Sequence, residues 1–68
     1  MDAADLTMGE AYEIQLDGGS WLEMEFLATI EHDLLFVVNR KTLVTFTSHE
    51  IATRCIEGSL RRKVQISV

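Results

Sequence analysis

Short alternating segments separated by turn residues fill positions 11–57, and they constrain the fold of this 68-residue chain more than any other feature. Apolar and polar side chains alternate with a period of two in residues 11–16 and 21–31, the pattern of a half-buried strand. Between them lies Asp-Gly-Gly-Ser at positions 17–20, which predicts a hairpin turn because glycine accepts positive φ angles. The chain therefore begins its ordered part with two strands, the second unusually long.

Three further strands are predicted, at residues 34–39, 42–47 and 51–57. Residues 34–39 are apolar on both faces, which suits a central strand or one that meets another subunit. Residues 48–50 are expected to form a single turn, and Gly58 and Ser59 end the last strand. Five short strands and no proline predict an all-β fold, a small and strongly bent barrel whose interior is filled by side chains.

The organisation is that of one domain at residues 11–57, preceded by a tail or short helical turn at 1–10 and followed by an extension at 58–68. In the extension Val64, Ile66 and Val68 alternate with polar residues, which predicts a possible extra C-terminal strand. A chain of this size is close to the lower limit for independent stability. Because the single Cys55 excludes an internal disulfide, we expect oligomerisation to supply the support.

The net charge of −5 opposes nucleic-acid binding by a single copy, since phosphate contacts require positive charge. The acidic residues dominate positions 2–33, and the basic ones follow from position 40. No apolar run long enough for a membrane span and no signal peptide are visible. Together with the lone cysteine, this predicts a cytoplasmic protein without membrane contact.

Catalysis and metal binding are not expected. His32, His49 and Cys55 lack the paired spacing of a zinc site. No nucleophile, base and oxyanion donors can be assembled from these residues, so we expect neither an enzyme nor a cofactor.

The order of these segments resembles the Sm-like (LSm) family, and its bacterial Hfq branch in particular. The Asp17-Gly18-Gly19 turn, the long strand 21–30, the apolar strand 34–38 and the Thr47-Ser48-His49-Glu50-Ile51 turn correspond to the family's successive pieces. The resemblance covers residues 12–56 and implies a five-stranded SH3-like barrel of the Sm type. The glycine that the family places within its bent strand is absent here, where the chain reads Glu23-Met24-Glu25.

The resemblance also implies a homo-oligomeric ring that binds single-stranded RNA on its surface or pore rim. In such rings the fourth strand of one subunit pairs with the fifth strand of the next, which gives these subunit-interface candidates: Val44, Phe46, Ile51, Cys55 and Ile56. The loops expected at the rim, together with cations that would meet phosphates around the ring, give these RNA-binding candidates: His49, Ser48, His32, Asp33, Arg40 and Lys41.

Two alternatives to RNA binding by a ring stay open. The first is an acidic, oligomeric protein-interaction or scaffold module of phage or mobile-element type, which binds a protein partner and no RNA. The second is a regulator of the CsrA family, which residues 48–56 and the Gly9-Glu10 pair resemble.

Overall fold

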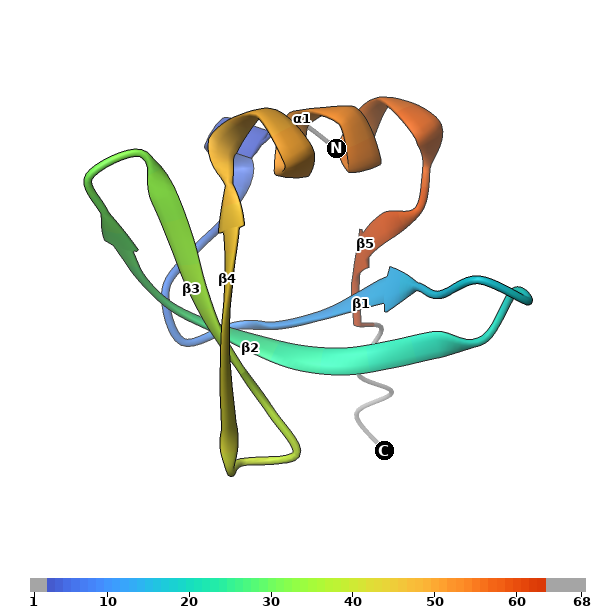
Figure 1. Cartoon of the computed structure of the whole chain (residues 1–68), viewed down its shortest axis with the longest axis horizontal. Helices are drawn as coiled ribbons and strands as arrows, with labels where there is room; N and C mark the ends of the chain where they lie inside the picture. The colour runs from blue at the N-terminus through green and yellow to red at the C-terminus, as the bar shows by residue number, and fades with distance from the viewer. Residues whose placement is uncertain (1–2, 64–68) are drawn as a thin grey trace, which may run out of the picture.

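The computed structural model describes residues 3–63 and contains a five-stranded antiparallel sheet with one α-helix (Figure 1). In chain order the elements are η1 (Ala3–Asp5), β1 (Ala11–Gln15), β2 (Trp21–Ile30), β3 (Asp33–Val38), β4 (Thr42–Thr47), α1 (Ser48–Glu57) and β5 (Leu60–Arg62). The strand order is β4-β3-β2-β1-β5. Since β4 and β5 both lie at edges, the sheet is not closed. A small, mostly β fold is therefore confirmed, and closure into a barrel is not.

The first four strands form where the alternation predicts them, to within one residue at each end. The five residues that separate β1 from β2 form a closed turn, in which the Leu16 amide donates to the Ser20 carbonyl at 2.7 Å. The turn between β3 and β4 places Asn39 and Arg40 at φ angles of 55° and 61°. Positive φ at both central residues is what a tight hairpin of matching twist requires.

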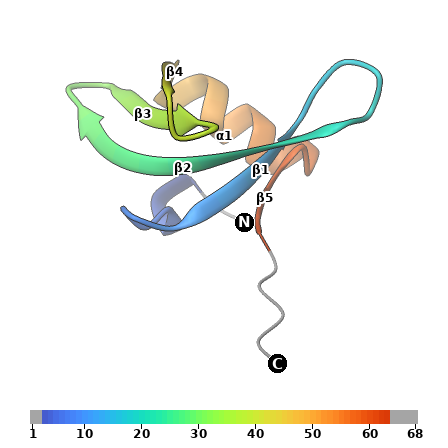
Figure 2. The same ribbon diagram turned by 90° about the horizontal axis from the view of Figure 1, so that it is seen from below.

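A β-bulge in the middle of β2 gives the sheet its bend. The register with β3 shifts between Phe26 and Ala28, so Leu27 is an extra residue without a partner of its own. Residues 21–25 of β2 pair with β1, whereas residues 24–30 pair with β3. Figure 2 shows β2 as one long curved strand that serves both halves of the sheet. A bulge bends a strand without glycine, which explains why none is needed here.

The prediction of a fifth strand at residues 51–57 is wrong, because these residues belong to the helix α1. The single turn expected at residues 48–50 is instead the first turn of that helix. Thr47 is the N-cap, and its hydroxyl accepts from the Glu50 amide at 3.1 Å. Gly58 ends the helix at φ 76°, and the amides of Gly58 and Ser59 donate back into its last turn. This arrangement is a Schellman motif, which requires a residue in the left-handed region.

The hydrophobic core lies between the concave face of the sheet and α1. Its buried members are Tyr12, Ile14, Met24, Phe26, Leu34, Phe36, Ile51, Cys55 and Leu60. The ring of Phe36 lies at its centre, 5.2 Å from the ring of Phe26 and 5.7 Å from that of Phe46. The helix contributes Ile51 and Cys55, which lie one turn apart and so face the same side.

The chain after Gly58 returns to the sheet. Leu60–Arg62 forms β5 and pairs with β1, with Tyr12 opposite Arg62. The extra C-terminal strand predicted from Val64, Ile66 and Val68 falls on residues that lie outside the described range. Near the N-terminus, Ala3–Asp5 forms the short 3-10 helix η1. No helix in the described range is long and apolar enough to cross a membrane.

The left-handed conformation of Gly58 leads to a stability prediction. A Cβ at this position would meet no atom within 4 Å, so only backbone strain opposes a side chain there. Gly58→Ala should lower the free energy of unfolding by about 1 kcal/mol in urea titrations. Gly58→Asn should cost less, because asparagine enters the left-handed region more readily. Equal stability of all three proteins would contradict the helix stop described here.

Candidate interaction surface

Four of the residues predicted to bind RNA come together where α1 begins. The Ser48 amide donates to the His32 carbonyl at 3.0 Å, and Asp33 pairs with Thr47 across the β3–β4 ladder. His32, Asp33, Ser48 and His49 therefore lie at one end of β4, and all are exposed. We call this end the helix-start corner, and define it by residues 31–33 and 48–50.

The helix-start corner is acidic. Besides Asp33 it contains Glu31 in the β2–β3 turn and Glu50 in the first turn of α1, all exposed. Carboxylates close to His49 would repel a phosphate backbone, so the charge of this corner opposes the RNA contacts predicted for it.

The other two RNA-binding candidates lie apart from these four. Arg40 and Lys41 form the turn between β3 and β4, where the Lys41 amide donates to the Val38 carbonyl at 3.1 Å. This turn is at the opposite end of β4 from the helix-start corner. The predicted phosphate contacts and the predicted base contacts are thus separated by the length of one strand.

The cations at the end of β5 are bound to acidic neighbours. Arg61 Nε lies 3.0 Å from Glu13 Oε1, and the Arg61 guanidinium stacks 3.7 Å from the centre of the Trp21 ring. Lys63 Nζ lies 2.8 Å from Glu23 Oε2. The basic run that the sequence places at the C-terminal end is therefore neutralised along β1 and β2.

The remaining arginines of this region also have partners, in an ion pair or in hydrogen bonds to backbone carbonyls. Arg62 Nη1 lies 3.8 Å from Glu10 Oε2, and its Nη2 donates to the Asp5 carbonyl at 2.9 Å. Arg54 donates from α1 to the Gln15 carbonyl at 3.0 Å. Of the lysines and arginines among residues 3–63, Arg40 and Lys41 alone have neither a carboxylate within ion-pair distance nor a side-chain hydrogen bond.

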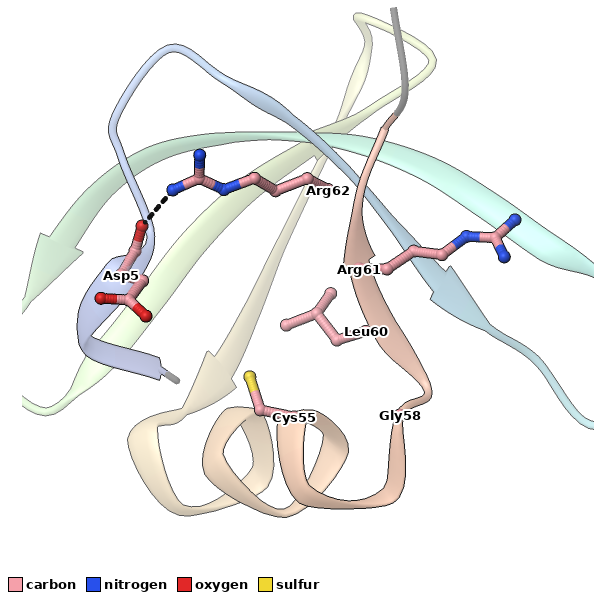
Figure 3. Close-up of a pocket in the computed structure, with 6 residues that line it drawn as sticks. All are labelled: Asp5, Cys55, Gly58, Leu60, Arg61 and Arg62. Carbon is pink, nitrogen blue, oxygen red and sulfur yellow. Dashed lines mark hydrogen bonds between the residues drawn. The ribbon is translucent and has the colours of Figure 1, made fainter. Parts of the chain in front are cut away.

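A hollow of about 530 Å³ lies between α1, η1 and β5 (Figure 3). In Figure 3 the Cys55 thiol and the Leu60 side chain point into the space between helix and strand, and Arg62 reaches across to Asp5. These residues can surround a small apolar group. Within the part of the chain that the structure describes, no three His, Cys, Asp or Glu side chains are grouped to hold a metal.

A second hollow, of about 490 Å³, lies near the β3–β4 turn. Glu23, Glu25, Arg40 and Lys63 contribute its charged lining. Since it contains charges of both signs, it favours neither an anionic nor a cationic ligand.

The convex side of the sheet carries an apolar surface. Residues directly opposite each other on paired strands share a face, so the β2–β3–β4 register places one set together. We call this set the outer face: Ala28, Ile30, Leu35, Val37 and Leu43. Leu43 is 61% exposed and Ile30 is 52% exposed. The apolar character of residues 34–39 on both faces had predicted such a surface, since Phe36 lies in the core while Leu35 and Val37 face outward.

The predicted subunit-interface residues have different environments. Val44 and Phe46 lie on the core side of β4 and are half-buried. Ile51 and Cys55 are buried in the core of their own chain, whereas Ile56 is 87% exposed on α1. The structure contains one copy of the chain, so their contacts with a neighbour stay a prediction.

Comparison of the chain with protein-family models, with curated proteins and with solved structures finds no match. The features that characterise its surface are the apolar outer face, the acidic helix-start corner and the paired cations of β5.

The pairing of the cations can be tested on stability. Arg61→Ala removes both the Glu13 ion pair and the stacking on Trp21, and should lower the free energy of unfolding by about 1 kcal/mol. Arg40→Ala is the matched control and should change it by less than about 0.5 kcal/mol. High salt should reduce the difference between the two variants. Equal effects in urea titrations would mean that Arg61 is free in solution.

Proposed function

We propose that this chain is a protein-interaction module whose outer face binds a protein partner in the cytoplasm. The observation that supports this function is an apolar surface on three strands that no other described element covers. Isolated apolar side chains are common on protein surfaces, but a contiguous apolar face marks an interaction site more often than chance. Val37 and Leu43 are cross-strand neighbours on this face, so they present adjoining apolar area.

The charge around the outer face indicates what such a partner presents. Glu25 is the cross-strand neighbour of Val37, and Asp33 that of Ile30. An apolar patch rimmed by lysine or arginine would complement this arrangement, since interfaces combine an apolar centre with a polar rim. The net charge of −5 would speed the approach of such a basic-rimmed partner.

The proposed surface can be tested by capture with matched variants. Val37→Lys places a charge in the centre of the outer face, on β3. Leu16→Lys places the same charge in the β1–β2 turn, where Leu16 is 45% exposed. Protein bound by the immobilised wild-type chain should be lost with Val37→Lys and retained with Leu16→Lys. The bound protein, identified by mass spectrometry and purified, should bind Val37→Lys at least about tenfold more weakly. Equal binding by both variants would contradict the surface.

RNA binding by an Sm-type ring is a second candidate function. The observation that favours it is the hydrogen bond from Ser48 to His32, which gathers four of the predicted RNA-binding residues. This candidate function requires a closed barrel, assembly of the barrels into a ring, and an RNA-binding site at the rim of that ring. The acidic surroundings of His49 and the pairing of the β5 cations place it second.

The second candidate predicts a role for His49. Stacking of a base on an aromatic side chain contributes about 1–3 kcal/mol, so His49→Ala should weaken oligo-uridine binding by about fivefold or more. Thr53→Ala, an exposed change elsewhere on α1, should leave the affinity unchanged. Fluorescence anisotropy with a labelled oligo-uridine measures both. Undetectable binding by the wild-type protein at low salt would eliminate this candidate and leave the first intact.

A further inference from the structure

The strand β4 has one edge whose backbone groups face away from the sheet. The bond from the Ser48 amide to the His32 carbonyl identifies Asp33 and Thr47 as a non-hydrogen-bonded pair of the β3–β4 ladder. Hydrogen-bonded and non-hydrogen-bonded pairs alternate along an antiparallel ladder. The backbone amides and carbonyls of Val44 and Phe46 therefore bond to β3. The amides and carbonyls of Leu43 and Thr45 therefore point outward, where the described chain provides no further strand.

This edge lacks the features by which proteins prevent edge-to-edge pairing. Thr42–Thr47 contains no charged residue and no proline, and its pairing with β3 runs without a bulge. The opposite edge differs, because the described β5 has three residues and includes Arg61 and Arg62. Charges and short length protect an edge strand, whereas a neutral strand of six residues is open to pairing.

The charges at the two ends of β4 are opposite in sign. Arg40 and Lys41 precede the strand, and they lack carboxylate partners among residues 3–63. The helix-start corner follows it with Glu31, Asp33 and Glu50. If two copies align their β4 strands antiparallel, the basic turn of each copy lies beside the acidic corner of the other. A parallel alignment would instead place like charges together.

We propose that two copies of this chain pair through β4, antiparallel and about a two-fold axis, to form one continuous sheet. This inference deepens the proposed function, since it joins the outer faces of both copies into a single docking surface. Opposed residues must share a face, so a residue and not a peptide bond between two residues lies at the axis. Val44 and Thr45 are the axis positions that preserve the faces and overlap most of β4. In either register Thr45 lies next to its own counterpart, directly opposite or on the diagonal.

Introducing a charge of either sign at Thr45 tests the pairing. Thr45→Lys and Thr45→Glu each place like charges beside each other at the two-fold axis, and each should weaken self-association at least about tenfold. An equimolar mixture of the two should recover a particle of twice the 7.7 kDa of one chain, because the charges then attract. Light scattering at low salt over a range of protein concentrations measures the mass, and far-UV circular dichroism confirms folding of each variant. Recovery in the mixture also excludes loss of folding as the cause.

The outcomes separate this inference from the proposed function. A wild-type protein that is monomeric up to the highest soluble concentration would overturn the pairing. Self-association that both single variants retain would also overturn it, as would a ring-sized particle. None of these results decides whether the outer face binds a protein partner. The capture experiment with Val37→Lys tests that separately, because Val37 lies on β3 and not at the edge. A wild-type chain that forms the two-copy particle and captures no other protein would refute the heterologous partner and leave the pairing standing.

Discussion

The fold depends on one constraint: β2 must pair with β1 in one half of the sheet and with β3 in the other. The bulge at Leu27 makes this possible, because it inserts one residue and turns the strand between Phe26 and Ala28. The curvature then encloses Phe36, whose ring contacts those of Phe26 and Phe46. A straight β2 would leave these rings on a flat surface, and α1 would have no concave face to cover.

The strands were predictable from the sequence because their signal is local, whereas the helix was misread. Alternation in β1 and β2 and the β-branched content of β4 predict those elements directly. For α1 a helical signal was present: Thr47 and Glu50 have the spacing of a capping box, Ile51 and Cys55 are four residues apart, and Gly58 follows as a stop. Dividing the segment into a single turn at residues 48–50 and a strand at residues 51–57 overlooks this signal. For the bulge the sequence offers one weak signal, since the apolar Leu27 interrupts the alternation of residues 21–31.

The features of the candidate sites also differ in whether local sequence could predict them. The outer face follows from the two-sided apolar character of residues 34–39, a local property. The proximity of His32 and Ser48 follows from hairpin register once the strands are known. The neutralisation of the β5 cations was not predictable, because Lys63 and Glu23 meet only through the pairing of β5 with β1 and of β1 with β2. Charge runs in a sequence give no indication of such long-range partners.

The pairing of Tyr12 with Arg62 has a consequence for how the chain folds during synthesis. The β1–β2, β2–β3 and β3–β4 hairpins join neighbours in sequence and can form as soon as each has been made. The β1–β5 ladder closes a loop that spans most of the chain, and such non-local contacts form late. Leu60 completes the core from this last strand. The three hairpins alone therefore leave the core incomplete until residues 60–62 have been made and have paired with β1.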